Sequence, residues 1–139
     1  GGRGSLGAAA AALARSVWRD GPAIVVVEPS QAAALQGSIR AGAAVQARGG
    51  VSSMGRLDCK MPSLIALKGL SRDADVFVTI DDGDVEGVLP LLADAGLATT
   101  PSGAAGLAVP LTASAAQKST LGLGPQSRIL AILSEEAEA

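Results

Sequence analysis

Apolar residues along this chain fall into short continuous runs and longer mixed stretches. The runs AIVVVEP at 23–29 and ADVFVTI at 74–80 are rich in β-branched residues, and we expect both to be strands buried on two faces, as in a parallel sheet. SRILAIL at 127–133 predicts the last strand. The alternating AAVQARGG at 43–50 predicts another short one.

Helix signals separate these strands. The alanine-dense stretch after the opening glycines has no proline and no β-branched residue until Val17, so a helix there costs little side-chain entropy. Ser30 and Ser63 stand where N-caps are expected, and Gly42 stands at a C-cap position. Pro110 should kink the last helix or end it early. The predicted helices cover residues 6–18, 31–41, 63–71, 84–96 and 99–115.

The alternation of strands and helices predicts an α/β domain. Right-handed crossovers place helices on both faces of a mostly parallel sheet, which gives three layers. The 139 residues contain no internal repeat, low-complexity linker or domain boundary, so we expect residues 1–139 to form one domain. VSSMGRLDCKMP at 51–62 has no period and predicts an ordered loop.

Composition narrows the functions that fit this fold. Hydrophobic residues make up 48% of the chain and charged residues 17%, which predicts a globular protein. Trp18 and Phe77 are its only aromatic residues and the net charge is −2, which argues against nucleic-acid binding. With no histidine and only Cys59 as cysteine, the common zinc sets, histidine-based catalytic pairs and an intrachain disulfide are excluded. No stretch approaches the ~20 apolar residues of a membrane span, so we expect a cytoplasmic protein.

The opening glycines form the first candidate site. GRGSLG at 2–7 matches the dinucleotide pattern G-x-G-x-x-G, and Glu28 ends the next predicted strand, where such folds keep a ribose-binding acid. The strand that should lead into the glycines is not part of this sequence, so that context is untested. Amides at a helix start also suit any phosphate monoester, and the glycines could equally be a terminus without a ligand. A dinucleotide, another phosphate and no ligand therefore all stay open at this point.

Several other stretches resemble the C-terminal half of the pyridoxal-phosphate enzymes of fold type II. These stretches are VVVEPSQAAAL, MGRLDCKMPSLIAL, ATTPSGAAGLA and RILAILSEE. In that family a G-V-G-S-M loop opens a helix and holds the cofactor phosphate, and GRGSL at 2–6 is similar to it. The resemblance is closest to diaminopropionate ammonia-lyases, more distant to serine and threonine dehydratases, and covers essentially the whole chain in order.

The resemblance implies a cofactor and the residues that contact it. Pyridoxal 5'-phosphate would be held at its ring nitrogen by Ser134, with Ser102 and Gly103 beside it at a helix start. Ser134 could alternatively cap a buried strand, and Ser102 could be an ordinary N-cap. The phosphate would be bound mainly through the backbone amides of Gly2, Arg3, Gly4, Ser5 and Leu6.

The resemblance also implies an activity, an α,β-elimination of ammonia from a small amino acid such as 2,3-diaminopropionate. The family keeps its cofactor-binding lysine upstream of the glycine loop, and the lysines here match no such position, so no catalytic residue is expected in this chain. We expect it to be inactive alone and to associate with the missing N-terminal half or as a homodimer. Thr100 and Glu136 depart from the family pattern, which holds an acid and a glycine there, and both bear on the substrate.

Two other interpretations remain, namely an NAD(P)-binding Rossmann domain of a dehydrogenase and a non-catalytic interaction fragment. The acidic stretch DDGDVEG at 81–87 lacks the spacing of a calcium loop, and its acids are explained by a helix start, so no metal is expected. Lys60, Lys68 and Lys118 are expected to be solvated surface residues.

Overall fold

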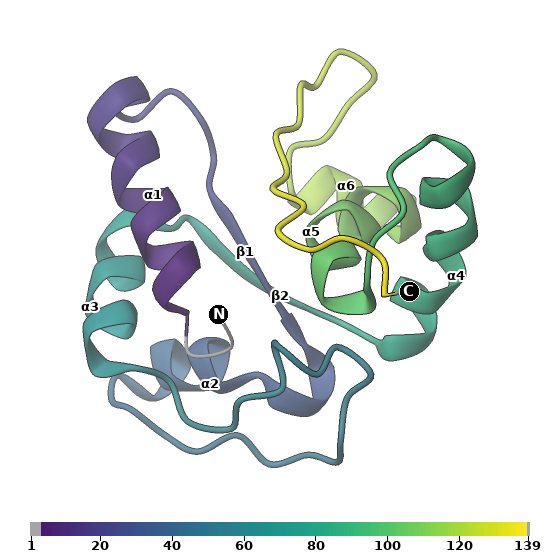
Figure 1. Cartoon of the computed structure of the whole chain (residues 1–139). Coiled ribbons are helices and arrows are strands. Elements are labelled where there is room, and N and C mark those ends of the chain that lie inside the picture. The colour runs from purple at the N-terminus through teal and green to yellow at the C-terminus, as the bar shows by residue number, and fades with distance from the viewer. Residues whose placement is uncertain (1–3, 139) are drawn as a thin grey trace.

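The computed structural model describes residues 4–138 and arranges them around a parallel pair of strands (Figure 1). β1 and β2 pair in register from Val25 opposite Val76 to Pro29 opposite Ile80. The elements, in chain order, are α1 (Ser5–Trp18), β1 (Val25–Pro29), the 3-10 turn η1 (Ser30–Ala32), α2 (Ala34–Ala41), α3 (Leu64–Asp73), β2 (Val76–Ile80), α4 (Asp82–Asp94), α5 (Pro101–Thr112) and α6 (Ala115–Thr120).

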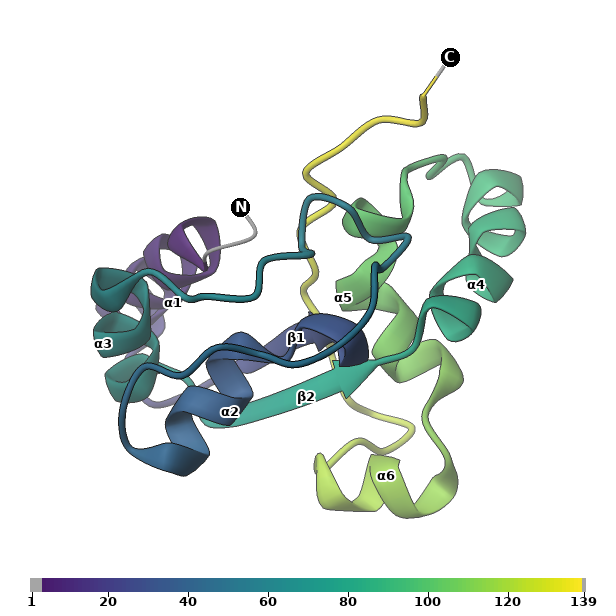
Figure 2. The same cartoon turned by 90° about the horizontal axis from the view of Figure 1, so that it is seen from below.

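The strands separate two hydrophobic cores, one on each face of the sheet. Neighbouring side chains of a strand point to opposite faces, and Val26 accordingly packs with Leu35 and Leu70 whereas Val27 packs with the other core. Figures 1 and 2 show α1 and α3 on one side of the strands and α4 and α5 on the other. The predicted three-layer α/β architecture is thereby confirmed.

The core that contains Val27 joins α4 and α5 to the sheet and to loop 51–62. Met54 of this loop is fully buried in it beside Val85 and Ala104, so a segment without helix or strand is anchored in the core. The predicted loop is therefore confirmed, and it is held by a side chain in the core.

Two predicted strands are absent from the described residues. The segment 43–50 makes no ladder, and its backbone bond from the Ala47 N–H to the Lys60 carbonyl (2.7 Å) ties it to loop 51–62 instead. Residues 127–133 are in neither a strand nor a helix, and Ile129, Leu130 and Ile132 are 52%, 76% and 60% exposed. An alternating or apolar segment becomes a strand only beside an edge with free hydrogen-bonding groups, and neither segment pairs with such an edge here.

Of the three predicted capping residues, Gly42 and Ser63 cap helices and Ser30 does not. Gly42 ends α2 with φ of +69°, and the Ser63 hydroxyl caps α3 by accepting the Ala66 N–H. Ser30 does not cap a helix, because it begins η1 and donates its hydroxyl to Asp81.

The predicted helix over 99–115 ends early, at Thr112, which is one of the two outcomes expected from Pro110. α5 ends two residues after Pro110, and Ser114 then opens α6 with a capping box to Gln117. None of the helices within residues 4–138 has the length and apolar character needed to cross a bilayer.

Candidate cofactor site

The start of α1 has the backbone features of an anion-binding helix start. Gly4 adopts the left-handed conformation (φ +88°) directly before the helix, and its carbonyl accepts the first helical bond from the Ala8 N–H at 2.8 Å. Within the described chain no side chain caps this helix start, and its first turn carries no acidic residue. The N–H groups at Ser5 and Leu6 therefore sit at the positive end of the helix dipole without a competing carboxylate.

Gly4 also lies where the surroundings leave little room for a side chain. An added Cβ would stand 3.1 Å from Leu35 Cδ1 and 3.4 Å from Ala66 Cβ. Leu35 belongs to the first turn of α2, soon after β1 ends, so the start of α1 lies at the carboxyl end of the strands. Gly2 and Arg3 lie outside the described residues.

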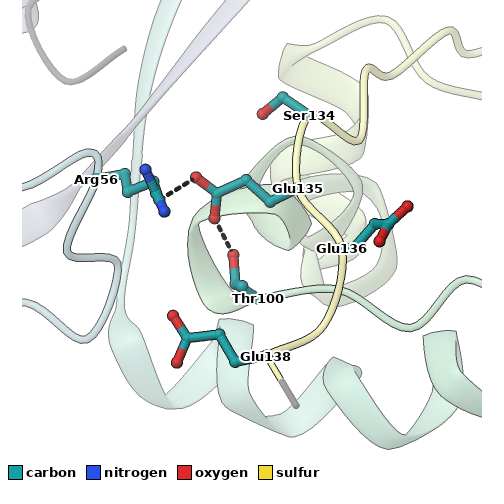
Figure 3. Close-up of a pocket in the computed structure, with 6 residues that line it drawn as sticks. All are labelled: Arg56, Thr100, Ser134, Glu135, Glu136 and Glu138. Atoms are coloured by element: carbon teal, nitrogen blue, oxygen red, sulfur yellow. Dashed lines mark hydrogen bonds and ion pairs between the residues drawn. The ribbon is translucent and has the colours of Figure 1, made fainter.

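Ser134 belongs to a second group of candidate residues, which line a cavity. A cavity of about 280 Å³ is lined by Ser134 with Arg56, Thr100, Glu135, Glu136 and Glu138 (Figure 3). Ser134 itself is exposed, and the neighbouring Glu135 is turned into contact with loop 51–62 and α5.

Loop 51–62 places this second group of residues at the carboxyl end of the strands, where α1 also begins. The Ser52 hydroxyl donates to Asp82 at 2.6 Å, and Asp82 begins α4 just after β2 ends. Further along the loop, the Arg56 N–H donates to the Ser102 hydroxyl at 3.1 Å in the first turn of α5. The starts of α4 and α5 therefore lie together beyond the carboxyl end of β2.

The predicted residues Ser102 and Gly103 have different surroundings. Ser102 lines a neighbouring cavity of about 410 Å³ and does not cap α5, because Thr100 is the N-cap and accepts the Gly103 N–H at 3.1 Å. Gly103 is buried, and an added Cβ would fall far inside van der Waals contact of Thr99 Oγ1 and 3.4 Å from Glu135 Cβ. Gly103 thus serves close packing at the start of α5.

Neither of these two cavities is lined by Gly4, Ser5 or Leu6. The start of α1 is therefore not part of the lining that contains Ser134.

Comparison with known proteins shows to which family the chain belongs. A family model described as "Pyridoxal-phosphate dependent enzyme" matches residues 1–135. The chain belongs to this pyridoxal-phosphate dependent enzyme family. Comparison with curated protein sequences finds no significant match.

Solved structures similar to this chain share the fold of the family. An L-serine ammonia-lyase from Rhizomucor miehei matches with TM-score 0.80 and 22% identity over 99% of this chain and 43% of its own. A threonine deaminase from T.th. matches with TM-score 0.71 and 21% identity over 80% and 41%. A maize serine racemase matches with TM-score 0.73 and 22% identity over 83% and 36%. The chain thus spans less than half the length of these structures.

The residues of this pyridoxal-phosphate family member fit both ends of its cofactor. Pyridoxal phosphate carries a phosphate monoester, which suits the uncapped start of α1, and a ring nitrogen, which suits a hydroxyl such as that of Ser134. Glu28, the acid that a dinucleotide site would need, is committed elsewhere. Glu28 is 8% exposed, and its carboxylate accepts the N–H groups of Leu35 at 2.7 Å and Gln36 at 2.9 Å. Glu28 therefore caps α2, and burial raises its pKa although these two bonds oppose the shift.

Lys60, which lies outside the two groups, is paired. The Lys60 ammonium donates to the Gly50 carbonyl at 2.7 Å and to Asp58, whose pKa the Lys60 hydrogen bond lowers. Lys60 thus remains partly exposed, at 27%, while its bonds close the loop 50–60, and Lys68 and Lys118 are exposed as expected. Within residues 4–138 no cluster of three or more metal-ligating side chains is found.

Proposed function

We propose that this chain forms the cofactor-binding part of an ammonia-lyase that acts on a small amino acid such as 2,3-diaminopropionate. Family membership and the names of two similar structures, an L-serine ammonia-lyase and a threonine deaminase, support this class of reaction. The observation that carries the proposal is the start of α1, which glycine opens and no side chain caps within the described chain.

The phosphate is held chiefly by backbone amides. Gly4 lets the chain turn into α1 at positive φ and approach the anion without a Cβ. The amides of Ser5 and Leu6 then donate to the phosphate oxygens, with Gly2 and Arg3 completing the loop. The helix dipole adds a favourable interaction of about 0.3–1 kcal/mol for a negative charge at this position.

Ser134 holds the ring nitrogen. Pyridoxal phosphate, when bound, withdraws electrons from the carbanion that forms as the α-proton leaves. A neutral hydroxyl donates a hydrogen bond to the ring nitrogen without protonating it, which suits β-elimination. Ser102, at the neighbouring cavity, orients the adjoining loop by accepting the Arg56 N–H.

The complete site requires a further polypeptide segment, which brings the cofactor-binding lysine. In the described chain, β1 has a neighbour on only one of its edges. α1 lies on the same face as α3, so a right-handed crossover puts a strand that precedes α1 on the free edge of β1. α4 and α5 lie on the other face, so a right-handed crossover from β2 through these helices carries the segment 127–133 back past β1. The segment then lies beside the strand that precedes α1, on the side away from β1. This arrangement pairs the free edge of β1 and gives the segment 127–133 a partner strand.

A titration with two matched glycine variants tests the phosphate loop. Gly4→Ala forces a Cβ into positive φ and against Leu35, so pyridoxal phosphate affinity should fall at least tenfold. Gly7→Ala adds a Cβ that meets nothing within 4 Å and should leave the affinity within about twofold. NADH titrated separately should not bind, and saturable NADH binding without pyridoxal phosphate binding would establish a dinucleotide site instead.

The reaction and the association are tested together. The chain combined with its lysine-bearing segment should release ammonia from 2,3-diaminopropionate, whereas the chain alone should not. Sizing chromatography of the chain alone should show self-association through its open strand edge. Ammonia release by the chain alone would contradict the need for a further segment.

A further inference from the structure

Glu135 is the point at which three segments distant in the sequence meet. Figure 3 shows its side chain reaching from the C-terminal segment, residues 127–138, toward Arg56 of loop 51–62 and Thr100 before α5. Its side chain is 16% exposed, whereas Ser134 and Glu136 on either side are exposed. The described chain forms no strand ladder at this segment, so side-chain contacts alone hold it.

Both oxygens of the Glu135 carboxylate are engaged. Oε1 pairs with Arg56 Nε at 2.7 Å, and Oε2 accepts the Thr100 hydroxyl. The Thr100 oxygen in turn accepts the Gly103 N–H, so the carboxylate is linked to the first turn of α5, where the helix dipole favours a negative charge. Because the Thr100 hydroxyl donates to a carboxylate and accepts an N–H, the two hydrogen bonds polarise and strengthen each other.

The backbone at Glu135 is fixed independently of its side chain. Thr99 donates its hydroxyl to the Glu135 carbonyl at 2.6 Å. In an extended chain neighbouring side chains point to opposite sides, and the burial of residues 131–135 alternates accordingly. Fixing both the carboxylate and the carbonyl of Glu135 therefore fixes the direction in which Ser134 presents its hydroxyl.

We propose that Glu135 is a positioning residue, which orients the Ser134 hydroxyl toward the cofactor ring nitrogen by bridging Arg56 and Thr100. The inference rests on the proposed role of Ser134 and adds to it. Arg56 is 75% exposed, so its ion pair contributes little by itself, and the Thr100 bond at the helix start contributes more. Glu135→Gln retains an acceptor for Thr100 and should preserve most of the function, whereas Glu135→Ala should lose it.

The first test needs no cofactor and measures the backbone order of Ser134 by NMR relaxation. In the unaltered chain the order parameter of the Ser134 amide should be near that of rigid backbone, about 0.85. Glu135→Ala should lower it below about 0.6, and Glu136→Ala, which removes an exposed neighbouring carboxylate, should leave it unchanged. An equally rigid Ser134 in Glu135→Ala would overturn the proposal.

The second test reads the electronic environment of bound pyridoxal phosphate from its absorbance spectrum, in the chain combined with its lysine-bearing segment. Ser134→Ala and Glu135→Ala should shift the band in the same direction, and the double variant should match Ser134→Ala alone. Additive shifts would mean that Glu135 does not act through Ser134 and would overturn this inference. If Ser134→Ala leaves the spectrum unchanged, the proposed ring-nitrogen contact fails, and the NMR result still decides whether Glu135 orders the segment.

Discussion

Gly103→Ala is the substitution for which helix propensity and packing predict opposite effects. Glycine within a helix costs about 0.5–1 kcal/mol relative to alanine, so propensity alone predicts a more stable protein. The new Cβ, however, would enter the space of Thr99 Oγ1 and stand 3.4 Å from Glu135 Cβ. The sign of the effect therefore shows whether the close packing at the start of α5 is as tight as the structure indicates.

The packing cost exceeds the propensity gain. Overpacking typically costs about 1–3 kcal/mol. Displacing Thr99 breaks its 2.6 Å bond to the Glu135 carbonyl, which is worth about 0.5–1.5 kcal/mol. After subtraction of the propensity gain, Gly103→Ala should destabilise the protein by about 0.5–4 kcal/mol. For a chain of this size, this lowers Tm by roughly 2–16 °C.

Gly106→Ala in the same helix is the matched control. Its Cβ would stand 3.9 Å from Ala131 Cβ, an ordinary contact, so this variant should gain about 0.5–1 kcal/mol. Thermal and urea unfolding of both variants give the comparison, and Thr99→Ala combined with Gly103→Ala should recover much of the loss, since the obstructing hydroxyl is gone. If Gly103→Ala unfolds at or above the temperature of the unaltered protein, the packing argument is refuted.

Three further substitutions test the framework around the site. Arg15→Ala removes hydrogen bonds to three backbone carbonyls and the 2.6 Å pair with Asp75, and urea unfolding should show a loss of about 2–4 kcal/mol, with Arg15→Lys recovering less than half. Leu70→Ala empties a fully buried site in α3 and should cost about 2–5 kcal/mol, while Leu64→Ala, 71% exposed in the same helix, should change stability by less than about 0.5 kcal/mol. Burial raises the pKa of Glu28, so just above the ordinary pKa of glutamate the folded state binds more protons than the unfolded state. Lowering the pH through that range should therefore stabilise the unaltered protein, whereas it should not stabilise Glu28→Gln. At lower pH both should lose stability, because the Ile24 N–H and Arg15 hold the pKa of Asp75 below its usual range, and a flat stability profile across acidic pH would contradict this reasoning.

The family and its fold were predictable from the sequence because their signals are local or ordered along the chain. β1 and β2 are short β-branched runs, and each stands within a residue or two of its predicted bounds, although most of their residues are not fully buried. The cofactor was predicted by resemblance, since GRGSL, VEP and the later motifs occur in the family order, and the family match over residues 1–135 agrees. The positive φ of Gly4 follows from the same short motif.

Tertiary contacts decided the features for which a local pattern allows several outcomes. The segment 127–133 has the composition of a strand, but a strand needs a partner edge, and within residues 4–138 it pairs with none. Ser30 and Ser102 look like N-caps in sequence, yet Glu28 and Thr100 serve α2 and α5, because a side chain caps only the amides it can reach in space. The sequence by itself determined the α/β alternation, the cofactor class and the glycine at the start of α1. Only the tertiary structure placed Glu135 between Arg56 and Thr100, because hydrogen bonds between residues about 35 and 80 positions apart leave no local pattern.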